Sequence, residues 1–172
     1  MKNNLKIGLF GINSSSGIAM TMDKDRWSAN WDDILKTVKI CDQNGLDFIF
    51  SVQRWLGFGG KTDPASLTYD SLSFCSAISS ITSNIELVAT IHTPLFHPTH
   101  IARALSSIDQ FSKGRINLNV VCGWNKKEFQ MFGINEINKD DLYQQGEIWI
   151  KILKNIFNKQ IKNYSNKYFN CI

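Results

Sequence analysis

The sequence alternates short apolar runs with longer segments of helical periodicity, and this alternation occurs four times. The apolar runs span residues 5–12, 46–52, 85–91 and 116–121. After each run, apolar side chains recur every three or four positions, as they do from Trp31 to Cys41, which is the spacing of an amphipathic helix. Alternating strands and amphipathic helices predict an α/β fold in which right-handed crossovers join the strands of a parallel sheet.

Glycine and proline residues mark the predicted boundaries. Gly45 and Gly114 follow the first and third predicted helices, where a left-handed cap belongs, and Pro98 suits a first helical position. The longest loops come after the strands, at residues 13–28, 53–66, 92–97 and 122–140. Functional loops lie at the carboxyl ends of strands both in doubly wound open sheets and in (β/α)₈ barrels, so the periodicity leaves both architectures open.

The composition excludes several classes of protein. With 172 residues, 43% hydrophobic and 20% charged, the chain is expected to form one globular domain with a core. The net charge of +4 comes from scattered basic residues, so a nucleic-acid interface is not expected. Without a membrane-length apolar stretch or a secretory signal, a cytoplasmic location is expected. Of the four separate cysteines, three lie in apolar segments and are expected to be buried.

The glycine-rich segment at residues 57–62 resembles a phosphate-binding P-loop only superficially. A P-loop needs a glycine five residues before its Gly-Lys pair and a helix directly after it. Here the first position is Trp55, and Asp63-Pro64 follows the segment. The early glycines of the chain also lack the G-x-G-x-x-G spacing of a dinucleotide-binding fold. Nucleotide binding through either motif is therefore disfavoured.

Polar residues near the third and fourth predicted strands are candidates for ligand contacts. His92, His97 and His100 lack a nearby carboxylate as a fourth ligand, so no metal site is predicted. His92 ends a strand on the side where ligands bind, and a ligand contact stays open for it. Asn117 and Asn119 lie two positions apart in an apolar strand, hence on one face of it. Asn119 is closer to the carboxyl end and is the better candidate.

The segment from Ser107 to Trp124, SIDQFSKGRINLNVVCGW, closely resembles the ID..S.GR...N.V.GW signature of the bacterial-luciferase-like flavin-dependent monooxygenases. Residues 127–129 and 131–133 continue the match. Residues 51–60 resemble the corresponding loop in the branch that contains pyrimidine oxygenases and dimethylsulfone or alkanesulfonate monooxygenases. The similarity runs along nearly the whole chain, so the joint pattern is more specific than any single motif.

This resemblance implies a (β/α)₈ (TIM) barrel that binds FMN, in the reduced form FMNH₂, at the carboxyl ends of its strands. It also implies that O₂ oxygenates a small organic substrate, and that a separate flavin reductase supplies FMNH₂ with electrons from NAD(P)H. By position, the residues that the resemblance assigns to flavin contacts are Gln53, Arg54, Asn119, Glu128 and Tyr143. It identifies no catalytic residue. Leu142 stands where related proteins tend to carry arginine, so one charge beside the flavin phosphate is expected to be missing.

A complete barrel typically takes about 250 residues, whereas this chain contains four strand–helix units in 172 residues. Residues 161–172 resemble the small hairpin that precedes the fifth strand in the family. We therefore expect residues 1–172 to be the amino-terminal half of the barrel domain, a truncated half-barrel. The side chains expected to face the barrel interior are Ile7, Leu9, Ile49, Leu87, Ile116 and Leu118.

A half-barrel of this kind would form a homo-oligomer or associate with a complementing carboxyl-terminal half, because its terminal strands would have unpaired edges. Two alternatives to a working monooxygenase stay open. One is a non-catalytic flavin-binding or self-associating remnant of such an enzyme. The other is an unrelated open-sheet binding domain, which the signature around Asn119 disfavours.

Overall fold

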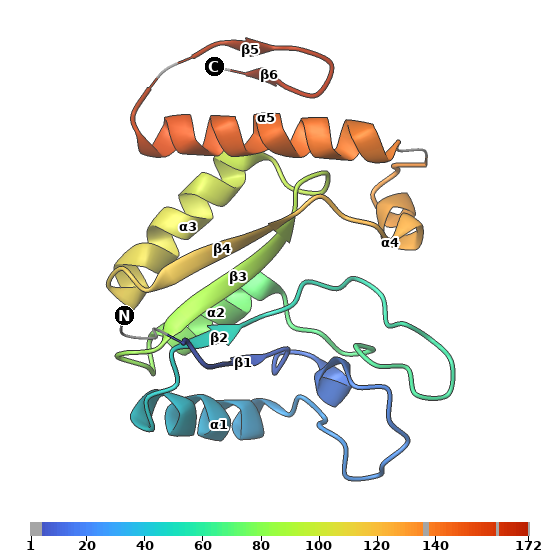
Figure 1. Cartoon of the computed structure of the whole chain (residues 1–172), viewed down its shortest axis with the longest axis vertical. Coiled ribbons are helices and arrows are strands. Elements are labelled where there is room, and N and C mark those ends of the chain that lie inside the picture. Colours follow the sequence, from blue (N-terminus) through green and yellow to red (C-terminus); the bar gives the residue numbers. More distant parts are fainter. Residues whose placement is uncertain (1–4, 136–137, 161, 172) are drawn as a thin grey trace. The chain divides into compact units, whose positions relative to one another are not determined.

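A computed structural model describes residues 5–135, 138–160 and 162–171. The helices and strands follow one another in the alternating order that the sequence predicts (Figure 1). They are β1 (Gly8–Phe10), the 3₁₀ helix η1 (Ser15–Ile18), α1 (Trp31–Gln43), β2 (Phe48–Phe50), α2 (Ser71–Ser79), β3 (Glu86–His92), α3 (Pro98–Ser112), β4 (Ile116–Val121), α4 (Lys126–Met131), α5 (Lys139–Phe157), β5 (Tyr164–Ser165) and β6 (Asn170–Cys171).

The first four strands form one sheet in the order β1-β2-β3-β4. β1 pairs with β2, and β2 with β3, in parallel. Between β3 and β4, the amides of Leu87 and Thr93 donate to the carbonyls of Arg115 and Val121. In both hydrogen bonds the acceptor lies the same number of residues after the donor, as parallel pairing requires. The predicted α/β fold with a parallel sheet is therefore confirmed.

The chain folds into two compact units. The first comprises residues 1–90 and 107–119, and the second comprises residues 91–106 and 120–172. β3, α3 and β4 contribute residues to both units, because the boundaries fall inside these three elements.

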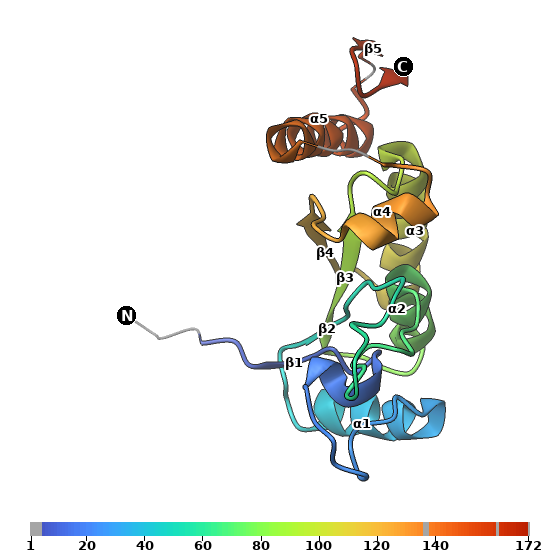
Figure 2. The ribbon, with the colours of Figure 1, turned by 90° about the vertical axis from the view of Figure 1, so that its right-hand side faces the viewer.

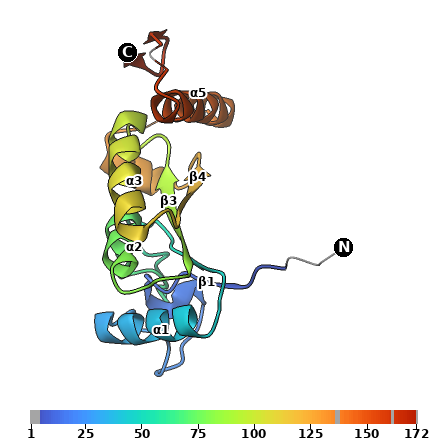
Figure 3. The ribbon, with the colours of Figure 1, turned by 90° about the vertical axis from the view of Figure 1, so that its left-hand side faces the viewer.

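In the first unit, α1 and α2 lie on the same side of the strands (Figures 2 and 3). Ile49 is 1% and Leu87 0% exposed, because strand alternation directs both side chains toward the helices. Phe10, Phe50 and Val88 lie on the opposite face of the strands, which we call the exposed face. Phe10 is 52% exposed, and its ring packs edge-on against Phe50 at 5.1 Å between centroids. The exposed face is thus aromatic and apolar.

This alternation corrects one prediction from the sequence. Ile49 and Leu87 were expected to face a barrel interior, and they belong instead to the core beneath the helices. Leu9 pairs with Ile49 in β1 and β2 and so shares its orientation. The prediction was wrong because the apolar runs carry large hydrophobic residues at both odd and even positions. The sequence therefore does not determine which face of each strand is directed toward the helices.

The turn from α3 into β4 is built by part of the signature segment. Gly114 has a φ of +83°, a left-handed conformation that favours glycine. The hydroxyl of Ser112 accepts a hydrogen bond from the amide of Arg115 at 3.2 Å. The Arg115 side chain donates five hydrogen bonds, to the carbonyls of Ser79, Thr82, Ile85 and Ser112 and to the Thr82 hydroxyl. These residues fasten the start of β4 to the turn between α2 and β3.

In the second unit, α5 contributes the fully buried Trp149, whose indole N–H donates to the carbonyl of Phe96 at 2.7 Å. A side chain at Gly146 would place its Cβ 2.7 Å from the Cys122 sulfur, so this close approach of α5 requires glycine. α5 matches the helix that the sequence predicts from Leu142 to Ile156.

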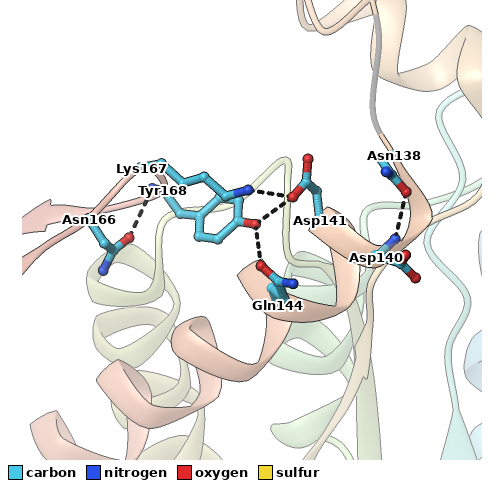
Figure 4. A network of polar contacts seen from close by, with 7 residues as sticks. All are labelled: Asn138, Asp140, Asp141, Gln144, Asn166, Lys167 and Tyr168. Carbon is cyan, nitrogen blue, oxygen red and sulfur yellow. Dashed lines mark hydrogen bonds and ion pairs between the residues drawn. The ribbon is translucent and has the colours of Figure 1, made fainter.

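β5 and β6 form an antiparallel hairpin in which Tyr164 lies opposite Cys171. This confirms the predicted hairpin, although positions 161 and 172 lie outside the described residues. Lys167 donates to Asp141 in the first turn of α5, and the Tyr168 hydroxyl donates to the same carboxylate at 2.9 Å (Figure 4). The hairpin is therefore attached to the start of α5.

Two further details differ from the expectation. The helix α4 lies inside a predicted loop, because six residues are too few to show helical periodicity. Only Cys41 and Cys75 are buried, whereas Cys122 and Cys171 are partly exposed, so the expectation of three buried cysteines was wrong. None of the helices in the described ranges is long and apolar enough to span a membrane.

Candidate functional site

Two long loops that follow β1 and β2 are tied to each other by backbone hydrogen bonds. The amide of Ser15 donates to Leu67, and that of Tyr69 donates to Asn13. The non-glycine residues with left-handed backbones in these loops and their borders are Ser16, Ile18, Ala29, Asp63 and Ala65. Each such conformation costs on the order of 1–3 kcal/mol, and such residues cluster at functional sites. The strain therefore marks the carboxyl ends of β1 and β2 as a candidate site.

Asn13 connects the two loops to the end of β2. Its side-chain oxygen accepts from the amide of Val52 at 2.9 Å, and its Nδ2 donates to the carbonyls of Val52 and Tyr69 at 2.8 and 2.9 Å. Asn13 is completely buried, so these bonds satisfy backbone groups that would otherwise be costly to bury. A single amide thereby continues the pairing of β1 and β2 beyond their last residues.

Gln53 holds the start of α2. Its Oε1 accepts from the amide of Ser71 at 2.8 Å, and its Nε2 donates to Asp70 at 3.3 Å. Asp70 caps α2 by accepting from the amide of Ser73. Gln53 is 3% exposed, and both ends of its amide are used inside the protein. Its geometry explains a structural role, and its predicted contact with flavin stays a prediction.

Arg54 lies in the glycine-rich loop. Its guanidinium carbon stands 4.4 Å from the centroid of the Phe58 ring, a cation–π arrangement. The loop itself is shaped by Asp63, which accepts from the amide of Gly59 at 2.6 Å. A Cβ on Gly57 would come within 2.4 Å of the same carboxylate. α2 does not begin until Ser71, so this loop differs from a P-loop, which leads directly into a helix.

Asn119 belongs to a hydrogen-bonded chain of polar residues at the carboxyl ends of β2, β3 and β4. Its Nδ2 donates to the Thr90 hydroxyl at 3.2 Å, and Thr90 donates to the carbonyl of Ser51 at 2.6 Å. The hydroxyls of Ser51 and Ser71 are 2.6 Å apart, and Ser71 accepts from the amide of Thr90 at 2.7 Å. Asn119 is half-buried at the end of this chain, and a ligand could therefore reach it.

In the second unit, Gly123 follows β4 with a φ of +87°. A Cβ there would lie 2.4 Å from the Phe129 ring, so the signature glycine allows α4 to pack beneath the loop. Glu128 lies in the first turn of α4 and is 1% exposed. Negative charge is favoured at that end of a helix, and the predicted flavin contact of Glu128 stays a prediction.

Tyr143 lines a cavity of about 740 Å³ in the second unit. The tyrosine side chain is 70% exposed. Lys126 and Lys139 also line this cavity, together with Trp124 and Asp141. The hydrogen bond from Lys167 lowers the pKa of the Asp141 carboxyl and raises the pKa of Lys167. Because Lys167 compensates Asp141, the lining of the cavity favours an anionic group.

The five predicted flavin residues fall in two places. Gln53, Arg54 and Asn119 belong to the first unit, where Ser71 and its neighbours connect Gln53 to Asn119 through hydrogen bonds. Glu128 and Tyr143 belong to the second unit. His92 is buried at the end of β3. Within the ranges that the structure describes, no group of side chains has the arrangement of a metal site.

The sequence reasoning missed the residues that orient Asn119 and order the loops. Thr90, Ser51 and Ser71 are buried polar side chains next to apolar ones. A threonine within the apolar run LVATI was the available signal, since a buried hydroxyl requires a partner. Asn13 gives a similar signal directly after the first apolar run, at the start of the predicted loop.

Comparison with known proteins places the chain in a family. The sequence profile of the luciferase-like monooxygenases matches residues 9–171. The pyrimidine monooxygenase RutA of Caulobacter vibrioides (strain NA1000 / CB15N) is 26% identical over 167 residues, which are 96% of this chain and 47% of that protein. The chain thus spans about half the length of the relatives that it matches.

Solved structures agree on the fold. Riboflavin lyase RcaE, solved with a modified FMN and its substrate riboflavin, matches with a TM-score of 0.79 at 23% identity, over 97% of this chain and 45% of its own. EDTA monooxygenase EmoA from Chelativorans sp. BNC1 matches with a TM-score of 0.80 at 18% identity, over 96% and 44%. Since the family profile covers almost the whole chain, this protein belongs to the luciferase-like monooxygenase family.

Proposed function

We propose that this chain is the amino-terminal half, residues 1–172, of a (β/α)₈ barrel that acts as an FMN-dependent monooxygenase on a small organic substrate. The observation that carries the proposal is Asn119, a half-buried amide held by a polar chain at the carboxyl ends of the strands. Ligands in parallel α/β folds bind at these ends. When bound, reduced FMN would supply the chemistry that activates O₂ for oxygenation of the substrate. The protein would bind the cofactor, exclude water and orient the substrate.

Two residues of the first unit could contact the ring of a flavin. Asn119 offers an amide that can accept or donate hydrogen bonds at a ring edge. Arg54 adds a positive charge in the adjoining loop. We propose both residues as flavin contacts, and Gln53 as a residue that supports them by fixing the start of α2.

The second unit contains a cavity whose lining suits an anionic group such as a phosphate. The cavity at Tyr143 carries Lys126 and Lys139, and among its described lining residues the carboxylate of Asp141 is paired with Lys167. A phosphate group would find two ammonium groups and a phenol hydroxyl there. We propose Tyr143 as a phosphate contact and Glu128 as a further residue of the site.

The exposed face of the sheet supports the half-barrel proposal. In the interior of a small barrel, this face would be filled by side chains from the opposite strands. Phe10 and Phe50 provide such a surface here. We propose that a complementing carboxyl-terminal half, or a second copy of the chain, covers it. We further propose that the complete enzyme works in the cytoplasm with a separate flavin reductase that uses NAD(P)H.

The test of the site is a fluorescence titration of FMN with the chain completed by a polypeptide that supplies the remaining half. Replacing Asn119 with Leu should weaken binding about tenfold or more, since an amide hydrogen bond is lost and an apolar group faces the ring edge. Asn117→Leu is the matched control, because Asn117 lies on the same face but is exposed nearer the start of β4. Equal affinities of the wild type and Asn119→Leu would remove Asn119 from the site.

A second candidate function follows from the length of the chain. It spans 47% of the RutA relative, so groups that the relatives carry in their other half would be absent from a chain acting alone. In that case the chain would be a non-catalytic flavin-binding or self-associating remnant. FMN binding by the completed protein, without transfer of an oxygen atom from O₂ to any of the small organic substrates tested, would favour this alternative.

A further inference from the structure

We propose that Thr90 is a positioning residue that fixes the orientation of the Asn119 amide, so that its carbonyl oxygen, and not its NH₂ group, faces the ligand. The inference rests on the proposed ligand site but follows from the hydrogen bonds of the protein alone. It assigns a role to a buried hydroxyl that the family signature does not include, since Thr90 lies in β3 and the signature begins in α3.

The Thr90 hydroxyl has a single proton to donate. Thr90 Oγ1 lies 2.6 Å from the backbone carbonyl oxygen of Ser51. A carbonyl can only accept, so the proton of Thr90 must point toward Ser51. The short distance and the burial of Thr90 make this bond costly to break.

The same hydroxyl oxygen also contacts Asn119. With its proton used, Thr90 Oγ1 can only accept from Asn119, whose side-chain amide lies 3.2 Å away. The two ends of an asparagine amide differ in this respect, because the nitrogen donates and the oxygen accepts. The NH₂ group must therefore face Thr90, and Oδ1 must point the other way.

Thr90 itself is held in place by a further hydrogen bond from its backbone. The amide of Thr90 donates to the Ser71 hydroxyl at 2.7 Å, and this hydroxyl lies 2.6 Å from that of Ser51. Ser71 is also the first residue of α2, and its own amide donates to Gln53. Backbone and side chain of Thr90 are thus both fixed, which makes the orientation of Asn119 a property of the folded chain before any ligand binds.

The consequence is chemical selectivity. Among the described residues, Oδ1 of Asn119 has no hydrogen-bond partner within the protein. The site therefore presents an acceptor and selects a ligand that offers an N–H or O–H donor at this point. A nitrogen-rich ring with exchangeable N–H groups satisfies this requirement. A ligand whose edge carries only hydrogen-bond acceptors does not.

The orientation can be tested without flavin, by NMR on the full chain labelled with ¹⁵N at asparagine side chains. The Asn119 signal is assigned as the one that disappears in Asn119→Asp. In the wild type, its amide protons should exchange with solvent several-fold more slowly than those of exposed Asn117, which serves as an internal control. Equal exchange at the two residues would overturn the proposal.

Substitutions at Thr90 add a second, independent test. Thr90→Val should shift the Asn119 amide signals and remove their protection, whereas Thr90→Ser, which keeps the hydroxyl, should preserve both. Identical Asn119 signals in the wild type and in Thr90→Val would contradict the proposal.

With the completed protein, Thr90→Val should weaken FMN binding about threefold to tenfold, and Thr90→Ser should restore it. If the wild type binds no FMN, the proposed function fails, and the NMR result still decides the orientation. If the wild type binds FMN and Thr90→Val binds it equally well, the inference about the ligand fails.

Discussion

Replacing Arg115 with lysine should destabilise the protein strongly, although the charge is kept. The arginine side chain donates five hydrogen bonds at distances from 2.7 to 3.0 Å, four of them to backbone carbonyls. A lysine has three donors on one nitrogen and cannot reproduce the planar fork, so at least two of these bonds are lost. At roughly 0.5–1.5 kcal/mol for each lost bond, with a further cost for carbonyls left unsatisfied, we expect a loss of about 2–4 kcal/mol.

This change is measurable by thermal or urea unfolding of the chain. For a protein of this size, about 2–4 kcal/mol corresponds to a fall in Tm of roughly 5–15 °C. Arg26→Lys is the matched control, because the exposed Arg26 side chain donates, within the part of the chain that the structure describes, only to the carbonyls of Thr21 and Thr62. It should change the free energy of unfolding by less than about 0.5 kcal/mol. If the two variants unfold alike, Arg115 does not fasten β4 to the preceding turn, and the structural explanation of the Gly-Arg pair in the signature is refuted.

Three further predictions concern stability and association. Asn13→Ala should cost about 3 kcal/mol in urea unfolding, since buried backbone groups of Val52 and Tyr69 lose their partners, while Asn117→Ala should be nearly neutral. Burial alone would raise the pKa of Asp42, but the amides of Ser83, Asn84 and Ile85 and the charge of Arg115 together lower it. The stabilisation that results from this lowered pKa is fully present above the pKa of about 4 that Asp42 has in the unfolded chain, and it is lost as the pH falls through the pKa of the folded protein. Asp42→Asn should therefore reduce the decrease of the free energy of unfolding at acid pH. Because Phe10 lies on the exposed face, residues 1–172 alone should self-associate in sedimentation velocity, and Phe10→Lys should reduce this; a monodisperse wild-type monomer would speak against the half-barrel proposal.

The alternation of strands and helices was readable from the sequence because each element repeats one periodicity over many residues. β4 was predicted with its observed bounds, and α3 begins at Pro98 as expected. β1 and β2 are shorter than their apolar runs, since the sequence does not tell where strand pairing gives way to side-chain bonds such as those of Asn13. The orientation of the strands was not predictable either, because large apolar residues such as Phe48 and Ile49 stand next to each other in them.

The candidate site was predictable where it follows a recognisable pattern. The resemblance to the family singled out Asn119 and Tyr143, which lie at a strand end and at a cavity. Thr90 escaped notice because its role arises from contacts with Ser51 and Asn119, which lie 39 and 29 positions away in the chain. Local periodicity carries no information about such distant hydrogen bonds.

The most direct test of the proposed function is the amount of FMN bound per chain, measured by equilibrium dialysis with and without a polypeptide that supplies the remaining half of the barrel. The completed protein should bind about one FMN per chain, and the chain alone should bind little, because half of the site and the cover for the exposed face would be absent. A completed, folded protein that binds no FMN would contradict the proposal that residues 1–172 form half of a flavin-dependent monooxygenase.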